Sequence, residues 1–253
     1  MKVSVVYVTF NESKKLKRSL DSVKDFASEI VIVDLGSSDG VEDVAKEFQA
    51  KVYNHEKVPY VELIRSYAIS KANGSWVMIL DPDEVVSKSL VVWLKKLINN
   101  VTNTTVAVNI PRKNIFFGKW IRHTNFWPDR QIRFFQKDLV AWPKRIHIYP
   151  IVRGLVVDLP ADPNLALQHF GYDNYSDFWQ RQKRYSTIEA SNLHHEGIKG
   201  SIFRLIWSPL KIFLVRFIKH QGFIDGTEGL FLIFGLMYFS LVTEIKLLKL
   251  ETK

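Results

Sequence analysis

Short runs of apolar and β-branched residues recur along the first third of the chain, and each run ends in polar or acidic residues. Runs this short and this rich in β-branched residues predict strands rather than helices. The last run leads directly into the acidic segment 81–84, in which a proline separates two aspartates. The runs lie at 3–9, 30–34, 51–53 and 76–80.

Helical spacing of apolar residues fills the intervals between these strands. Apolar residues recur every three or four positions between 16 and 26, again around 44–48, and over 61–72, which predicts three helices. Strands that alternate with helices favour right-handed crossovers and a mostly parallel sheet with helices on both faces. We therefore predict an α/β fold in which the polar strand ends share one edge of the sheet.

The acidic segment 81–84 is where we expect the chemistry. In an open α/β sheet the ligand crevice lies outside the carboxyl ends of the strands. Asp81 and Asp83, at alternate positions there, can offer oxygen ligands to a hard divalent cation such as Mg²⁺ or Mn²⁺. The chain has no cysteine to favour a softer metal. The alternative interpretation is a solvated turn after an ordinary strand.

Four motifs in order resemble a known family: VSVVYVTFNES, EIVIVDLGSSDG, RSYAISKANGSW and LDPDE. Together they resemble the nucleotide-sugar-binding half of family 2 glycosyltransferases with the GT-A fold, over about the first 85 residues. The remainder is similar, more loosely, to the membrane-associated branch that includes lipopolysaccharide-core β-glucosyltransferases. The resemblance implies a Rossmann-like, mostly parallel sheet with helices on both faces, followed by amphipathic membrane-associated helices.

The resemblance assigns donor-binding roles to five residues. Thr9 and Asn11 match positions that line the nucleotide base, and Asp34 matches the carboxylate that bonds the uracil or ribose. Asp39 matches a second acidic position, although its side chain can instead cap the following helix. Arg65 matches an arginine that reaches the donor diphosphate, a task that suits its planar fork; the alternative is a surface arginine on an amphipathic helix.

Metal binding is implied for Asp83, for Asp81 and for His169. We expect Asp83 to contact the ion directly, whereas Asp81 contacts the ribose or reaches the ion through water. His169 resembles a histidine that supplements the metal or diphosphate site, with a hydrogen-bonded core histidine as the alternative. Two positions depart from the family: Leu35 stands where many members carry a second aspartate, and Ser66 replaces a frequent asparagine.

Glycosyl transfer with inversion needs a base for the acceptor hydroxyl. The segment 125–135 resembles the acceptor-side motif of the family, and Asp129 within it is our first candidate. His147 is the rival, at a position where relatives often show histidine followed by glutamate. Ile148 takes the place of that glutamate here, and a structural role for His147 is the alternative.

Charge is concentrated in one part of the chain. The 253 residues carry a net charge of +9 and no cysteine, so a disulfide framework is excluded. Residues 111–153 hold 10 basic and 2 acidic side chains, interleaved with aromatic residues. Such a surface suits nucleic acid or an anionic lipid headgroup or phosphorylated glycan. The sugar-nucleotide motifs favour the second, so we expect no nucleic-acid partner.

The C-terminal region has a different character. Residues 185–193 predict a helix, and residues 202–217 mix apolar and basic positions in the manner of a membrane-surface helix, with Pro209 as a kink. Residues 229–243 lack charge but fall short of the roughly 20 residues that a bilayer crossing needs. We expect an interfacial or re-entrant helix paired with its predecessor; a homo-oligomer contact and a single short span are the alternatives.

The predicted organisation has three parts: a nucleotide-sugar half at 1–110, an acceptor half at 111–199 and a helical membrane-association region at 200–253. No signal-peptide pattern precedes the first strand, so we expect a peripheral or monotopic location at the cytoplasmic face of a membrane.

The predicted activity is inverting, metal-dependent transfer of a hexose from a nucleotide sugar, with UDP-glucose as an example, to a lipid-linked or lipopolysaccharide-type acceptor. The alternatives are a nucleotidyltransferase, disfavoured because no glycine-rich phosphate loop with a lysine follows the first strand, and a non-catalytic membrane-bound scaffold.

Overall fold

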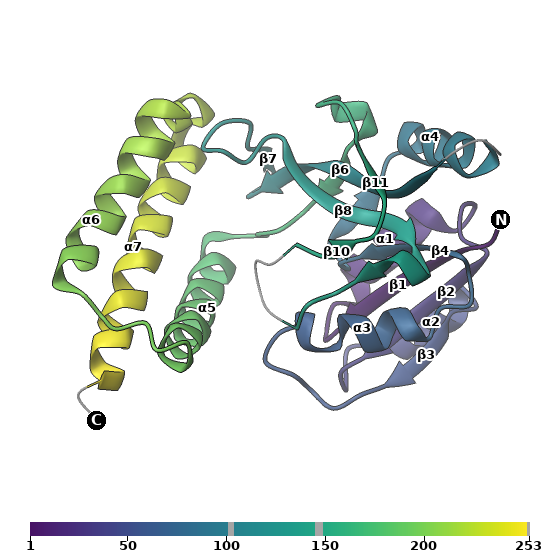
Figure 1. Cartoon of the computed structure of the whole chain (residues 1–253), viewed down its shortest axis with the longest axis horizontal. Coiled ribbons are helices and arrows are strands. Elements are labelled where there is room, and N and C mark those ends of the chain that lie inside the picture. The colour runs from purple at the N-terminus through teal and green to yellow at the C-terminus, as the bar shows by residue number, and fades with distance from the viewer. Residues whose placement is uncertain (101–103, 145–148, 252–253) are drawn as a thin grey trace. The chain divides into compact units, whose positions relative to one another are not determined.

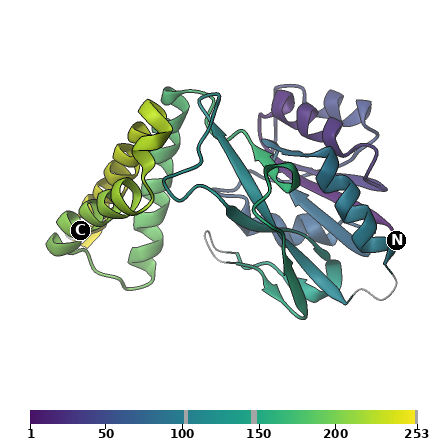
Figure 2. The same ribbon diagram turned by 90° about the horizontal axis from the view of Figure 1, so that it is seen from above.

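The computed structural model describes residues 1–100, 104–144 and 149–251 (Figure 1, and from above in Figure 2). The chain divides into two compact units, and it passes between them three times. The first unit comprises Met1–Arg112 and Arg130–His169, and the second comprises Lys113–Asp129 and Phe170–Lys253.

The first unit is built around a mixed sheet with helices on both faces. Its main strands are β1 (Val3–Thr9), β2 (Glu29–Asp34), β3 (Lys51–Asn54), β4 (Trp76–Leu80), β5 (Glu84–Val86), β6 (Thr105–Phe116), β8 (Asp129–Gln136), β11 (Leu155–Asp158) and β12 (Leu167–His169). Its helices are α1 (Ser13–Val23), α2 (Val41–Glu47), α3 (Glu62–Ser70) and α4 (Lys88–Asn99). A small separate ladder pairs β9 (Val140–Ala141) with β10 (Ile151–Val152).

The sheet runs in the order β3-β2-β1-β4-β8-β6-β12-β5. Strands β3, β2, β1 and β4 are parallel, which confirms the predicted parallel half. Beyond β4 the direction changes, because β8 pairs antiparallel with β4 and β12 pairs antiparallel with β5. The late strands therefore extend the sheet from its β4 side, which brings residues from the middle of the chain to the edge where the first strands end.

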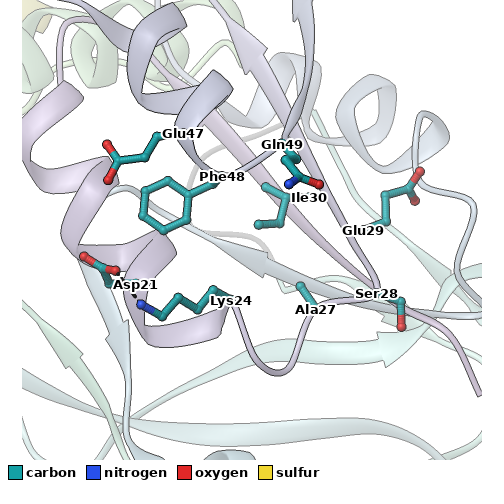
Figure 3. Close-up of a pocket in the computed structure, with 9 residues that line it drawn as sticks. All are labelled: Asp21, Lys24, Ala27, Ser28, Glu29, Ile30, Glu47, Phe48 and Gln49. Carbon is teal, nitrogen blue, oxygen red and sulfur yellow. Dashed lines mark hydrogen bonds and ion pairs between the residues drawn. The ribbon is translucent and has the colours of Figure 1, made fainter.

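A shallow hollow lies at the amino ends of the strands, between the end of α1, the start of β2 and the end of α2 (Figure 3). Its lining includes Glu29, whose carboxylate accepts hydrogen bonds from Ser4, Lys51 and Asn73. Ligands of parallel sheets bind at the opposite, carboxyl ends. The hollow is therefore not where the candidate site lies.

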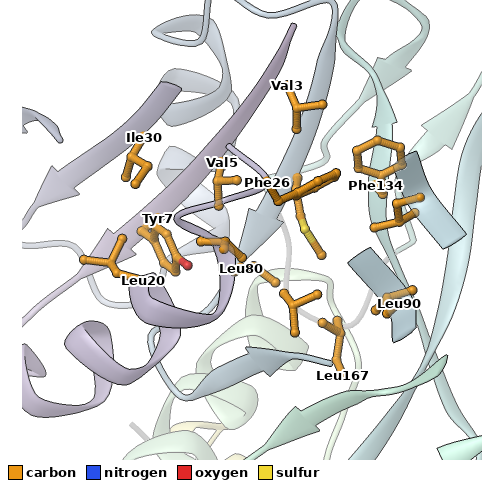
Figure 4. Packing of buried hydrophobic residues seen from close by; sticks show 14 of the residues in the cluster. Val3, Val5, Tyr7, Leu20, Phe26, Ile30, Leu80, Leu90, Phe134 and Leu167 are labelled. Atoms are coloured by element: carbon orange, nitrogen blue, oxygen red, sulfur yellow. The ribbon is translucent and has the colours of Figure 1, made fainter. Parts of the chain in front are cut away.

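Alternation along β1 builds a core on each face of the sheet. Val3, Val5 and Tyr7 point to one face, where they pack with residues of α1, α2 and α4 (Figure 4). Val6 and Val8 point to the other face, which α3 covers. A strand that is buried on both faces reads as a continuous apolar run, which explains why the sequence pattern of β1 is unbroken.

The second unit is mainly helical. It contains α5 (Tyr175–His195), α6 (Ile202–Phe213), a π-helical continuation (Leu214–Lys219), the 3-10 turn η4 (Gly222–Asp225) and α7 (Gly226–Glu251). The two-residue strand β7 (Lys119–Trp120) pairs with the last two residues of β6, which belong to this unit. Helix α7 packs against both α5 and α6. Gly235 permits the close approach of α5, because a Cβ there would lie 2.4 Å from the Phe178 ring.

The structure extends two of the predicted C-terminal helices. The helix predicted at 185–193 begins at Tyr175, where the Asn174 side chain accepts a hydrogen bond from Asp177 N and caps it. The uncharged stretch at 229–243 is the centre of the much longer α7. Within the described residues, the segment Gly222–Glu251 is long and apolar enough to cross a membrane by length and composition.

Candidate active site

The ends of three parallel strands meet at one edge of the first unit. The register pairs Thr9 with Asp34 across β1 and β2, and Tyr7 with Leu80 across β1 and β4. Thr9, Asp34 and Asp81 therefore share this edge, as the sequence predicted. Thr9 is buried, and its Oγ1 has no hydrogen-bond partner among the residues that the structure describes.

The loops after β1 and β2 hold each other in place. Asp34 accepts a hydrogen bond from Ser37 N at 3.0 Å, while Asn11 N donates to Ser37 Oγ and Asn11 Oδ1 accepts from Ser38 N, both at 2.8 Å. Asn11 adopts a positive φ of 53°, which asparagine tolerates better than most residues. The predicted base-binding residues Asn11 and Asp34 thus belong to one interlocked turn.

Asp39 has a structural role in this turn. Its Oδ2 accepts a hydrogen bond from Ser13 N at 2.8 Å, and its carbonyl accepts one from Ser13 Oγ at 2.9 Å. Ser13 is the first residue of α1, so the carboxylate satisfies a free backbone donor at that helix start and complements its dipole. The capped helix is the preceding α1, whereas the sequence suggested a cap on the helix that follows.

Asp81, directly after β4, lies between two arginines. Arg65 of α3 donates from Nη2 to Asp81 Oδ1 at 3.0 Å, and Arg133 of β8 bonds Oδ2. Burial alone would raise the pKa of Asp81, but the charges of Arg133 and Arg65 outweigh it and hold that pKa well below its usual range. Both carboxylate oxygens are therefore engaged by cations.

Arg133 also binds a fully buried carboxylate. Its Nη2 donates to Glu84 Oε1 at 2.8 Å, and Glu84 Oε2 accepts from Asp81 N at 3.0 Å. Arg112 Nη1 approaches Glu84 Oε1 at 3.5 Å. Burial lowers the pKa of Arg133, but Asp81 and Glu84 raise it above its ordinary value. The result is a network of two carboxylates and two arginines, extended by Arg112, in which Asp81 alone of the first four is half-buried and the others are buried.

Sequence reasoning missed Arg133, Arg112 and the role of Glu84. A signal was present, because Arg133 interrupts the apolar run of β8 between Ile132 and Phe134. A charge in the middle of a buried strand needs a buried partner of opposite sign. The strand order that supplies this partner was not readable from the sequence.

Arg65 is buried and only partly bonded. Its Nη2 is used by Asp81 and lies 3.7 Å from Glu62 Oε1, and its guanidinium stands 5.3 Å from the centre of the Trp142 ring. Its Nε and Nη1 have no hydrogen-bond partner within the described part of the chain. Buried donors of an arginine fork without partners are a prepared contact for an anion.

Asp83 and His169 lie together at the same edge. Asp83 is buried, and its Oδ2 is 3.6 Å from His169 Nε2. The antiparallel pairing of β5 and β12 brings them close, with His169 opposite Glu84 in the register. In the ranges 1–100, 104–144 and 149–251, no group of three or more histidine, cysteine or acidic side chains is arranged to hold a metal.

Of the two candidate bases, the structure describes Asp129 alone. Asp129, the first residue of β8, belongs to the second unit, where its Oδ2 accepts a hydrogen bond from Asn114 Nδ2 at 3.2 Å. Asn114 is buried and also donates to Phe126 O, so it holds the carboxylate in one orientation. His147 lies outside the described residues.

The sequence model of the family described as glycosyl transferase family 2 matches residues 4–153, more than half of the chain. The chain belongs to glycosyl transferase family 2. This family 2 glycosyltransferase is also similar over its whole length to an uncharacterized glycosyltransferase of Rickettsia conorii, at 26% identity across 92% of that protein. A similar relative of Rickettsia typhi is 25% identical over the whole chain and 89% of its own length.

Solved structures show the GT-A fold for this glycosyltransferase. A mannosyltransferase of Pyrobaculum calidifontis, solved with GDP-Man and Mn²⁺, matches with a TM-score of 0.55 at 14% identity, over 98% of this chain and 87% of that one. Residues 1–349 of TarS from S. aureus match with a TM-score of 0.51 at 16% identity, over 98% and 89%. At such identities the likeness concerns the fold alone.

Proposed function

We propose that the chain transfers a hexose from a nucleoside diphosphate sugar, with UDP as the expected carrier, to a lipid-linked or lipopolysaccharide-type acceptor at the cytoplasmic face of a membrane. The observation that carries the proposal is the buried Arg65 fork, whose Nε and Nη1 have no partner within the described residues. A diphosphate supplies the oxygen acceptors that these donors lack.

The network around Asp81 explains why Arg65 is ready for an anion. Asp81 holds Nη2 of Arg65 and fixes the plane of the fork, while Arg133 shares the charge of Asp81. Arg65, Arg133 and Arg112 carry three positive charges against the two negative charges of Asp81 and Glu84, so a positive charge remains to attract the diphosphate. We accordingly assign Asp81 to orienting Arg65, in addition to the ribose or metal contact that the resemblance implies.

The nucleoside end of the donor fits the interlocked turn after β1 and β2. Asp34 is buried beside Thr9, whose Oγ1 has no partner among the described residues. A carboxylate accepts hydrogen bonds from uracil N–H or ribose hydroxyl groups, and Asn11 presents further polar atoms there. Asp39 is engaged with Ser13, so we expect it to shape the turn rather than to touch the base.

A divalent cation fits Asp83 and His169. The pair offers one carboxylate and one imidazole 3.6 Å apart, and Mg²⁺ or Mn²⁺ would complete its shell with diphosphate oxygens and water. A site with two protein ligands suits a cation that arrives with the donor. When bound, the ion supplies Lewis-acid stabilisation of the departing diphosphate.

The reaction we propose is a single displacement with inversion. The bond from the anomeric carbon to the diphosphate oxygen breaks, the acceptor oxygen forms its bond to that carbon, and the hydroxyl proton passes to a base. Asp129 is the proposed base because it is an acidic residue held in place by Asn114. Arg65 binds the negative charge that develops on the leaving diphosphate.

Release of free nucleoside diphosphate tests the proposal. The full chain in detergent is given UDP-, GDP- and dTDP-sugars with Mg²⁺ or Mn²⁺, with and without a membrane-lipid extract. We expect lipid-stimulated release from one donor and its loss in Asp83→Ala, whereas the matched control Asp21→Ala, an exposed aspartate of α1, retains release. Pyrophosphate as the product would indicate a nucleotidyltransferase, and nucleotide binding without turnover would indicate a scaffold.

A further inference from the structure

Helix α6 and its π-helical continuation turn apolar side chains outward. Helices of soluble domains bury their apolar stripe and expose the polar one. Here the exposed large apolar residues recur at helical spacing and lie on one side of the helix along its whole length. We call this side the α6 face. Its members are Ile202, Phe203, Ile206, Trp207, Leu210, Leu214 and Ile218.

The outward direction of the α6 face is fixed by contacts on the other side of the helix. Helix α6 packs against α7, and Arg204 donates to Glu244 of α7 at 3.1 Å. Ser201, which caps the start of α6, also donates its N–H to Glu244. The polar groups of the helix start are thus used for internal packing, so α6 is held with its apolar face away from α7.

Positive charge accompanies the α6 face, and negative charge does not. Residues 202–224 contain four arginines and lysines and no aspartate or glutamate. Of these four, Lys211 and Lys219 are exposed. An exposed apolar and aromatic stripe beside cations, with no acid, is the pattern of a helix that lies in the interface of an anionic bilayer.

A second segment of the same unit extends this pattern. In η4, Phe223 and Ile224 are exposed, and the neighbouring Asp225 accepts hydrogen bonds from Arg122 N at 3.2 Å and His123 N at 2.7 Å. This contact fixes the exposed Arg122 next to the apolar turn. Two separate stretches of sequence therefore combine exposed apolar groups with a cation.

Helix α7 meets the length criterion for a span, but its neighbour α5 is unsuited to lipid. It packs against α5, and Lys246 of α7 donates to Ser186 Oγ and Thr187 Oγ1 of α5 at 2.7 and 2.8 Å. A bilayer crossing by α7 would carry α5 with it. That helix contains charged residues along its length, and charges in the hydrocarbon are costly.

We propose that the α6 face, with η4, docks into the headgroup region of an anionic lipid bilayer, and that α7 does not cross it. A second copy of the chain is the competing occupant. In a two-fold contact the same surface meets itself, so two positively charged faces would come together without acids in 202–224 to pair with. An anionic bilayer supplies the missing negative charge.

The inference deepens the membrane location of the proposed function, and it is tested without any nucleotide sugar. The full chain is sedimented with vesicles of phosphatidylcholine alone and of phosphatidylcholine with phosphatidylglycerol. We expect binding to the anionic vesicles that is at least tenfold tighter and that weakens with salt. Equal binding to both vesicles, or to neither, would overturn the proposal, while nucleoside diphosphate release would remain a separate result.

Matched variants locate the surface. Ile206 is 67% exposed and Val92, on α4 of the first unit, is 53% exposed, so glutamate is tolerated at either position in the folded chain. Ile206→Glu is expected to weaken anionic-vesicle binding at least tenfold, and Val92→Glu to leave it unchanged. If Ile206→Glu bound vesicles as the wild type does, the α6 face would have no role in bilayer binding. If the substitution changed only the oligomeric state in solution, the α6 face would be a dimer contact instead.

Charge reversal gives a second pair. Because each cation near an anionic bilayer contributes about fivefold to binding, Lys211→Glu/Lys219→Glu is expected to lose at least about tenfold. Lys14→Glu/Lys46→Glu makes the same change on exposed lysines of the first unit and is expected to lose far less. Equal losses in both pairs would mean a diffuse charge effect and would contradict a localised docking face.

The absence of cysteine allows the depth to be measured with single labels. A polarity-sensitive dye on Leu210→Cys is expected to brighten on anionic vesicles, and to be quenched by lipids that carry the quencher near the headgroup. A dye on Tyr238→Cys, at the exposed side of α7, is expected to escape quenchers placed at the end of the acyl chains. Strong quenching there would show that α7 crosses the bilayer.

Discussion

The two units differ in their exceptions to the usual burial pattern: the first unit buries charged side chains, and the second exposes apolar ones. In the first unit Glu84 and Arg133 are buried charges that pair with each other, and Arg133 also pairs with the half-buried Asp81. In the second unit apolar groups are exposed along the α6 face, with no covering element within the described residues. Buried charge with an unused donor indicates a ligand site, and exposed apolar surface indicates a docking site. The buried charges therefore indicate a small-molecule ligand, and the exposed apolar surface indicates a larger docking partner.

Removal of a buried charge in the first unit is expected to have the largest effect on stability, and removal of an exposed apolar side chain in the second unit a much smaller one. Arg133→Ala leaves the fully buried Glu84 without its closest cation, so we expect a loss of about 3–5 kcal/mol in the free energy of unfolding. Ile206→Ala removes exposed apolar area and is expected to change it by about 0.5 kcal/mol or less. Denaturant unfolding of both variants checks this, and equal losses would show that the network is not stabilising.

Asp83→Asn separates site chemistry from folding. Because the substitution removes the carboxylate proposed for the cation while conserving size, we expect turnover to fall by about a hundredfold or more. The unfolding midpoint should be nearly that of the wild type. Asp21→Asn, at an exposed aspartate of α1, is the control. Turnover of Asp83→Asn within a factor of two of wild type would remove Asp83 from the metal assignment.

Asn114→Leu tests whether the orientation of Asp129 matters. The amide donates to Asp129 at 3.2 Å, and its loss removes a hydrogen bond that orients the proposed base. We expect kcat to fall by roughly tenfold to a hundredfold while KM for the donor stays unchanged, with Asn99→Leu at the exposed end of α4 as the control. A change confined to KM would place Asn114 in donor binding instead.

The smallest expected effect concerns acid stability and Glu29. Burial raises its pKa, but hydrogen bonds from Lys51, Asn73 and Ser4 outweigh burial and lower it from 4.5 to about 2. A carboxylate with a lowered folded-state pKa stabilises the fold above its unfolded pKa, and that contribution is lost as the pH falls from 4.5 toward 2. Glu29→Gln should therefore show a shallower loss of stability in this range, measured by urea unfolding. An unchanged slope would contradict the assignment.

The sequence predicted the parallel half of the fold because β1, β2 and β4 are buried on both faces and read as apolar runs. It also placed Thr9, Asp34 and Asp81 at one edge, since parallel strands end together. The antiparallel strands β8, β5 and β12 were not predicted, because their pairing joins residues far apart in the chain. Arg133 and Glu84 were missed for this reason.

In the helical region, too, the sequence predicted an element but not how that element packs. The periodicity of 202–217 predicted an amphipathic basic helix, and α6 confirms a helix there. Which side would face outward was not readable, because it depends on the packing of α7 and on the Arg204–Glu244 pair. The three-part division of the chain and the roles of the individual site residues stay predictions.

Calorimetric titration of UDP and UMP into the wild type and Arg65→Lys tests the central claim, that the partly bonded fork of Arg65 holds the donor diphosphate through Nε and Nη1. A lysine keeps the charge but lacks the fork. We expect UDP to bind the wild type at least tenfold more tightly than UMP. In Arg65→Lys this preference should be largely lost while the affinity for UMP is unchanged. The control Arg18→Lys, at an exposed arginine of α1, should behave as the wild type. Equal UDP preference in the wild type and Arg65→Lys would contradict the claim.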